Sequence, residues 1–181
     1  DGIDTVRGVE FLQFADRRIA AGSNVAPDAK DDIGSTNADT VVAGTVLAND
    51  KDFNANPLSV SRVNGSPASV GVQITLASGA LLTINANGTY SYDPNGAFAG
   101  TPQGTTAIDS FTYQVSDGRG GFDTATAEIR VAGTKPNELG PLTLGVDTIP
   151  GTNLNDIIRG GDDTFSAFDN INGSGGTDTL A

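Results

Sequence analysis

Aspartate and asparagine are densest at residues 49–56, where their spacing could bind a metal ion. The oxygen-bearing residues, several of them at alternate positions, are Asn49, Asp50, Asp52, Asn54 and Asn56. In a tight loop this spacing can turn several oxygens towards one centre, as a calcium ion with about 6–8 oxygen ligands requires. The stretch is not an EF-hand, because that loop needs glycine and glutamate where this chain has Ala55 and Ser61. The alternative is a solvated turn whose side chains bind their own backbone.

Two further groups of carboxylates flank the strands expected in the middle of the chain. Asp31 and Asp32 are adjacent, and Asp117 and Asp123 enclose a glycine-rich segment. Adjacent carboxylates repel each other, and a divalent cation removes that cost. If both groups lie at one end of the fold, they can share ions with the 49–56 stretch or with a neighbouring domain. The alternative for Asp117 is an ordinary hairpin-turn residue.

Glycine and aspartate also recur near the end of the chain. Residues 173–180 nearly match the calcium-binding nonapeptide Gly-Gly-x-Gly-x-Asp-x-apolar, with Ser174 in place of the second glycine. In that repeat the glycines permit tight turns, Asp178 faces the metal, and Leu180 faces the core of a parallel β-roll. Residues 151–158, which contain Asp156, are a looser relative. Such a site needs the next turn of the roll for half of its ligands, so one good copy does not predict a complete site.

The composition excludes several classes of function. Lys and Arg number 10 against 22 Asp and Glu, which gives a net charge of −12, and Cys and His are absent. These absences exclude a disulfide framework, a thiolate nucleophile, a Ser-His-Asp triad and a His-ligated zinc. Without a basic patch, nucleic-acid binding is not expected. No apolar run approaches the roughly 18–20 residues of a membrane span, so no membrane insertion is expected. A hydrolytic site built on two carboxylates remains the catalytic alternative.

Period-two alternation of apolar residues predicts the elements that must position these side chains. It predicts strands over 70–76, 82–84, 90–92, 111–116 and 124–131. Asn87-Gly88 lies between two of these runs and predicts a hairpin. One buried face per strand indicates a mostly antiparallel, all-β body, and the aromatic residues are expected in its core or at an interface.

Composition divides the chain into three zones. Residues 1–26 contain one expected strand near 9–14 and end an upstream module or dock on the next one. Residues 27–134 form the all-β body. Residues 135–181 hold a linker, which begins near Gly133, and a turn-rich segment of glycine, aspartate and asparagine.

Four ordered motifs in the body resemble those of bacterial cadherin-like, VCBS-type Ig-like repeats. The motifs are VLANDKD at 46–52, PLSV at 57–60, GALLTINANGTYSYDPN at 79–95 and DSFTYQVSDG at 109–118. Such repeats occur in large secreted adhesins and other RTX-type exoproteins. Residues 1–16 look like the segment that often closes an RTX-type repeat region, and the tail looks like the start of another.

The resemblance implies an Ig/cadherin-like antiparallel β-sandwich with short flanking β segments. It implies a non-catalytic, calcium-binding module that spaces or stiffens a larger protein, secreted by a Gram-negative bacterium through type I secretion or held at its surface. Neighbouring domains of the same polypeptide are the expected partners. The alternatives are an adhesion domain that binds a cell-surface glycan or protein, and a non-catalytic portion of a secreted RTX-type enzyme.

The resemblance also assigns six aspartates as the best candidate ligands, namely Asp31, Asp32, Asp50, Asp52, Asp117 and Asp123. In this chain Asn54-Ala55-Asn56 replaces the family's more acidic, glycine-rich continuation, which lowers the calcium affinity expected there. Together with the residues chosen from spacing, the candidate metal ligands are Asp31, Asp32, Asn49, Asp50, Asp52, Asn54, Asn56, Asp117, Asp123, Asp156 and Asp178.

Overall fold

The computed structural model describes residues 11–13, 18–20, 23–139, 148–159 and 170–181. In these ranges the regular structure is strand, apart from one 3-10 turn at Pro67–Ser69. The prediction of an all-β fold is therefore confirmed. Within the same ranges, no helix has the length and apolar character needed to cross a membrane.

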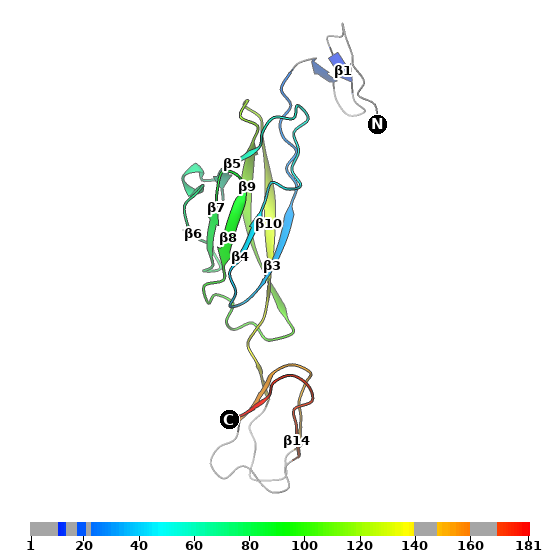
Figure 1. Ribbon diagram of the computed structural model, residues 1–181, viewed down its shortest axis with the longest axis vertical. Coiled ribbons are helices and arrows are strands. Elements are labelled where there is room, and N and C mark those ends of the chain that lie inside the picture. Colours follow the sequence, from blue (N-terminus) through cyan, green and yellow to red (C-terminus); the bar gives the residue numbers. More distant parts are fainter. Residues whose placement is uncertain (1–10, 14–17, 21–22, 140–147, 160–169) are drawn as a thin grey trace.

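Two four-stranded sheets pack face to face as a β-sandwich (Figure 1). The first sheet has the order β3 (Asp32–Asn37), β10 (Phe122–Ala132), β9 (Thr106–Ser116) and β5 (Ser59–Val63). The second has the order β4 (Val42–Thr45), β8 (Thr89–Asp93), β7 (Leu81–Ile84) and β6 (Ile74–Thr75). Neighbouring strands are antiparallel, except that β3 runs parallel to β10.

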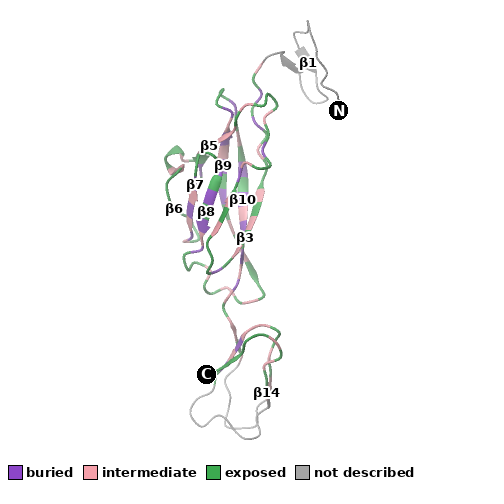
Figure 2. Cartoon of the chain, viewed as in Figure 1, coloured by how far each residue is buried: buried purple, intermediate pink, exposed green. Residues whose placement is uncertain are grey.

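The alternating residues of the sandwich strands form its core, as their period predicts. Every second residue is buried over 111–115 of β9 and over 125–131 of β10 (Figure 2). Each buried aliphatic side chain contributes about 1.5–3 kcal/mol. Three aromatic residues predicted for the core or an interface, Tyr90, Tyr92 and Tyr113, lie in this core. Tyr90 lies edge-on to Phe111, at 6.0 Å between ring centroids.

The predicted strand over residues 70–76 is largely wrong. Only Ile74–Thr75 form a strand, and Val72 is 53% exposed. Gly71 has a φ of +75°, which L side chains rarely adopt, so the chain turns here despite its alternating pattern. The hairpin predicted at Asn87-Gly88 is confirmed, because it joins the antiparallel β7 and β8 with Gly88 at a φ of +84°.

The segments before and after the sandwich are also β-structured. β1 (Phe11–Gln13) and β2 (Arg18–Ala20) form an antiparallel pair beyond one end of the sandwich (Figure 1). β1 falls within the strand expected near 9–14. Residues 1–10 lie outside the described ranges, so the RTX-like character assigned to 1–16 stays a prediction.

Beyond the other end of the sandwich, five short strands wind into parallel sheets (Figure 1). They are β11 (Asn137–Leu139), β12 (Thr148–Pro150), β13 (Asp156–Ile158), β14 (Asn170–Asn172) and β15 (Thr179–Leu180). Successive strands alternate between the sheets β11-β13-β15 and β12-β14, and all pairs are parallel. We call β11–β15 the C-terminal roll. Its register places the pattern at 173–180 beside its looser relative at 151–158.

Candidate functional site

Nine of the eleven predicted ligands gather at the end of the sandwich where the chain enters it. The entering segment, residues 23–31, passes between the 49–57 loop and the 117–121 turn that joins β9 to β10. Side chains from both contact it, and Asp28 forms an antiparallel bridge with Lys51. Asp156 and Asp178 lie in the C-terminal roll instead. The fold therefore brings together three acidic or amide groups that are far apart in the sequence.

Three amide and carboxylate side chains hold the first residues of the entering segment. Asn24 donates from Nδ2 to Asp117 Oδ2 at 2.6 Å, and the Val25 N–H donates to Asn54 Oδ1 at 2.7 Å. Asn56 donates from Nδ2 to Asn24 Oδ1 at 3.1 Å. We call these five residues the entry clasp. In it, Asn54, Asn56 and Asp117 bind protein atoms.

Asp117 is the best-bound carboxylate of the clasp, and its side chain is buried. Its Oδ1 accepts the N–H groups of Arg119, at 2.7 Å, and Gly121, at 2.9 Å. Burial alone would raise the pKa of Asp117, but the hydrogen bonds from Asn24, Arg119 and Gly121 hold that pKa below its usual value. This carboxylate therefore closes the hairpin turn and binds the entering segment at the same time.

Asp31, Asp52 and Asp123 also accept backbone hydrogen bonds. Thr126 N donates to Asp31 Oδ1 at 2.8 Å, Ala29 N to Asp123 Oδ2 at 2.9 Å, and Asn56 N to Asp52 Oδ1 at 2.9 Å. The other oxygen of Asp52 is buried and has no hydrogen-bond partner. One of the two oxygens in each carboxylate thus fixes a loop or a strand end.

The side-chain nitrogen of Asn49 acts as a hydrogen-bond donor to the backbone. Its Nδ2 lies 3.0 Å from the Asp31 carbonyl oxygen and 3.3 Å from that of Lys30. It ties the 49–57 loop to the entering segment.

Asp32 and Asp50 form a pair of partly buried carboxyls around the hydroxyl of Tyr113. That hydroxyl lies 2.8 Å from Asp32 Oδ2, 2.9 Å from the Lys30 carbonyl oxygen and 3.4 Å from each oxygen of Asp50. A phenol has one proton to donate. Lys30 N–H supplies one more hydrogen bond, to Asp50 Oδ1 at 2.7 Å. One hydroxyl proton therefore faces three acceptor groups, two of them carboxyls.

No three His, Cys, Asp or Glu side chains converge as a metal-binding group in the part of the chain that the structure describes. The carboxyl pair with the Lys30 carbonyl oxygen supplies three oxygen-bearing groups, fewer than the about 6–8 oxygens that calcium prefers. An ion here would need water or carbonyl oxygens to complete its shell. The calcium ligands predicted from the sequence stay a prediction.

Comparison with known proteins identifies the family. The sequence model of the bacterial cadherin-like domain matches residues 24–133. This chain belongs to that family. Domains of this family are typically non-catalytic adhesion or Ig-like modules that lie outside the cell or at its surface.

No curated protein matches the chain. Among solved structures, it is similar to a nucleoside hydrolase-related hypothetical protein from Saccharophagus degradans that is associated with carbohydrate metabolism. The identity is 9% and the TM-score 0.41, over 63% of this chain and 27% of that one. The match spans about a quarter of that structure's length.

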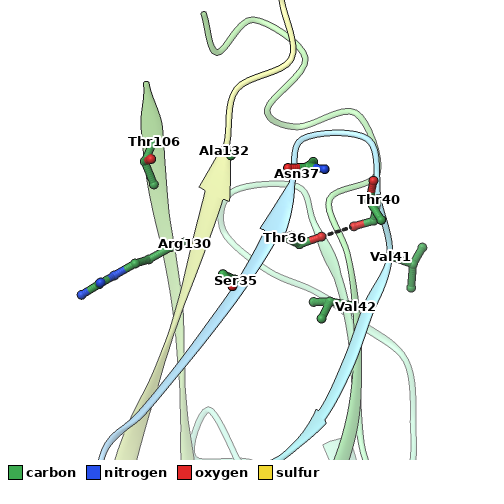
Figure 3. A pocket seen from close by; sticks show the side chains of 9 residues that line it. All are labelled: Ser35, Thr36, Asn37, Thr40, Val41, Val42, Thr106, Arg130 and Ala132. Atoms are coloured by element: carbon green, nitrogen blue, oxygen red, sulfur yellow. Dashed lines mark hydrogen bonds between the residues drawn. The ribbon is translucent and has the colours of Figure 1, made fainter. Parts of the chain in front are cut away.

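A groove at the opposite end of this cadherin-like domain lies beside the free edges of β3 and β4 (Figure 3). Its volume is about 530 Å³, and its lining includes Thr36, Asn37, Thr40 and Arg130. Arg130 is the one ionisable side chain among the lining residues, so the groove has no carboxylate pair for hydrolysis. A glycan or protein ligand for the domain stays a prediction.

Tyr113 and Asn24 are site residues that the sequence reasoning missed. Alternation along 111–116 predicted that Tyr113 is buried, but no pattern indicated where its hydroxyl would point. Asn24 precedes the body predicted at 27–134, and nothing in its neighbourhood links it to a residue 93 positions away.

The carboxyl pair predicts how the stability of this cadherin-like domain depends on pH. Burial raises the pKa of both Asp32 and Asp50 above 3.8, and repulsion from Asp50 adds to the shift at Asp32. A raised carboxyl pKa means that the folded state binds the proton more tightly. The stability that Asp32 and Asp50 contribute in this way is therefore complete below pH 3.8, and it is lost as the pH rises through their raised pKa values. We expect the free energy of unfolding in urea to rise as pH falls from 7 towards 4.

Asp50→Asn should flatten this rise, because the pair then has one titrating carboxyl. Asp39→Asn is the matched control, since it removes the same charge from an exposed turn between β3 and β4. Below about pH 4 the free energy of unfolding should fall again as the pH is lowered. The pKa of Asp117 is held below its usual value in the folded state, so protonation of this carboxylate removes the stability that its hydrogen bonds supply. Equal slopes in Asp50→Asn, Asp39→Asn and the unaltered domain would contradict the assignment.

Proposed function

We propose that this chain is a calcium-stabilised, non-catalytic spacer or adhesion module of a secreted or cell-surface bacterial protein. The observation that carries the proposal is the gathering of nine predicted ligands around the segment that enters the sandwich. Seven of them already bind entering-segment or loop atoms through hydrogen bonds. Asp31 accepts a hydrogen bond from Thr126 N in β10, and Asp32 binds the Tyr113 hydroxyl. A module that must hold its upstream neighbour at a fixed angle needs this kind of junction.

The path of the chain supports the spacer role. The chain enters beside the 117–121 turn and leaves beside the 101–105 loop, at opposite ends of the sandwich (Figure 1). Domains connected in this way follow one another end to end. The length of such a chain is the sum of the lengths of its domains, and the rigidity of each junction determines the angle between neighbouring domains.

Calcium would act at the carboxyl pair. Asp32, Asp50 and the Lys30 carbonyl oxygen would hold the ion. The single hydroxyl proton of Tyr113 does not cancel the repulsion between the two carboxylates, and the charge of the ion would offset it. The buried, unpartnered oxygen of Asp52 is a further free acceptor in the same loop as Asp50. With only two carboxylates in the pair, we expect weak binding, in the range of about 10⁻⁴–10⁻³ M that extracellular modules show.

Thermal melting with and without calcium tests the proposal. At a Kd of about 10⁻⁴–10⁻³ M, 10 mM calcium adds about 1.4–2.7 kcal/mol to the folded state. We expect Tm to rise by roughly 5–10 °C relative to chelator, and by much less in magnesium, which requires a tighter octahedral shell.

Asp50→Asn should abolish the calcium shift, whereas Asp39→Asn, which makes the same change of charge on an exposed turn, should retain it. Superimposed melting curves in calcium and in chelator would rule out calcium stabilisation. An equal shift in both variants would place the ion away from the carboxyl pair.

A further inference from the structure

The segment that leaves the sandwich is hydrogen-bonded along its length. Gly133 N donates to the Thr105 carbonyl at 2.9 Å, and Lys135 N donates to the Thr101 carbonyl at 3.1 Å. The Lys135 carbonyl in turn accepts from Gln103 N at 2.8 Å. A side chain on Gly133 would collide with the Thr101 and Pro102 carbonyl oxygens, so the contact requires glycine. The 101–105 loop thus holds the chain up to the first strand of the C-terminal roll.

The same loop also contacts the second turn of the roll. Gln103 Oε1 accepts the N–H of Asn155 at 2.7 Å. The Leu154 side chain covers Gly104, because a Cβ at that glycine would lie 2.7 Å from Leu154 Cδ1. Gly104 has a φ of +80°, which a residue without a Cβ adopts freely. The loop therefore provides a hydrogen-bond acceptor for Asn155 and a packing surface for the Leu154 side chain, both about 50 positions away in the sequence.

Asn155 connects this contact to every strand of one sheet of the roll. Its carbonyl accepts the N–H of Asn137, at the start of β11, at 3.1 Å. Its Oδ1 accepts the N–H of Thr177, two residues before β15, at 2.7 Å. Asn155 itself precedes β13. A bond at its N–H therefore fixes the residue that aligns all three strands.

A parallel roll of this length needs support from outside itself. In stacked architectures each turn contacts only its neighbours, about three or more turns are needed for stability, and the ends require caps. The described part of this roll has three strands in one sheet and two in the other, each of two or three residues. Its own backbone pairing is therefore short.

We propose that the sandwich is the N-terminal cap of the C-terminal roll, and that the 101–105 loop is the surface on which the roll aligns its strands. The loop fixes β11 through Lys135 and β13 through Asn155, so these two strands meet in register. The roll is consequently a dependent extension of the cadherin-like domain. This dependence is separate from calcium binding at the entry end.

Hydrogen exchange of the full chain, read strand by strand, tests the cap. Gln103→Ala removes the acceptor of the Asn155 N–H without changing any residue of the roll. We expect amides of β11, β13 and β15 to exchange about tenfold faster, since the loss of a partly buried hydrogen bond opens local structure to about this extent. Amides of β9 and β10 should keep their rates. Leu154→Ala, which removes the contact from the roll's side, should give the same pattern.

Gln73→Ala is the control, because Gln73 is an exposed glutamine of the sandwich away from this loop. It should leave both sets of amides unchanged. Unaltered exchange of the roll in both Gln103→Ala and Leu154→Ala would overturn the proposal. So would an equal acceleration in Gln73→Ala. Either result would leave the calcium shift at the entry end unaffected, so the two proposals fail independently.

Discussion

Gly121→Ala is expected to lower the free energy of unfolding by about 3 kcal/mol, because it forces a methyl group into a filled space. The added Cβ would collide with the Asp117 carboxylate and would lie 2.8 Å from the Ala26 Cα. Neither group can move aside easily, because Asp117 is buried and accepts several hydrogen bonds, and because Ala26 belongs to the entering segment. Relief of the clash must therefore open the entry clasp or distort the turn. Thermal melting should show a fall in Tm of roughly 10 °C.

Gly100→Ala is the matched control for this loss. Gly100 has no atom within 4 Å of its Cβ position, and its φ lies outside the left-handed region, so the added methyl group meets open space. The free energy of unfolding of this control should lie within about 0.5 kcal/mol of that of the unaltered chain. If Gly121→Ala melted like Gly100→Ala, the close packing of the entering segment against the turn would be wrong.

Tyr113→Phe is expected to cost about 2 kcal/mol at pH 7, because it removes the one hydroxyl proton between two partly buried carboxyls. The loss should shrink at pH 5. There, the raised pKa values of Asp32 and Asp50 favour a shared proton that can take the place of the hydroxyl donor. Urea denaturation at the two pH values measures the difference. Calcium should also raise the free energy of unfolding of Tyr113→Phe by more than it raises that of the unaltered domain.

Tyr92→Phe provides the comparison, since Tyr92 is another fully buried tyrosine whose hydroxyl donates to an aspartate. Its acceptor, Asp109 Oδ2, lies 2.8 Å away and also accepts from Ser78 Oγ at 2.6 Å. Because Asp109 retains the Ser78 donor, Tyr92→Phe should cost less than Tyr113→Phe at pH 7. Equal losses at pH 5 and 7 in Tyr113→Phe would remove the carboxyl pair as the cause.

The all-β class and four of the eight sandwich strands, β7 to β10, were predictable because burial of one face imposes a period of two on the sequence. β3, β4 and β5 were not predicted. β9 and β10 follow that pattern over 11 residues each, and Gly88 marks the turn between β7 and β8. The parallel pairing of β3 with β10 was not predictable, because period two says nothing of strand order. Residues 70–76 show the opposite failure. Their pattern is good, but Gly71 turns the chain.

The sequence also identified the acidic and amide residues of the entry end, but not their roles. Spacing alone suggested that Asn54 and Asn56 supply oxygens to an ion, whereas the fold uses them to hold the entering segment. Which backbone N–H groups come within reach of a carboxylate depends on contacts between distant residues. Asp123 with Ala29 and Asp31 with Thr126 are such contacts, each spanning more than 90 positions. Local spacing carries no record of them.

The parallel neighbours β3 and β10 also decide how this domain responds to tension. β3 is the strand through which the chain enters the sandwich, β10 is the strand through which it leaves, and six residue pairs join them side by side. A pull applied at the two ends of the sandwich drags β3 towards its start and β10 towards its finish, so the strands must slide along each other. The hydrogen bonds between the two strands are then loaded in shear at the same time, so they cannot break one after another. The domain gains resistance to a pull along the chain from this arrangement.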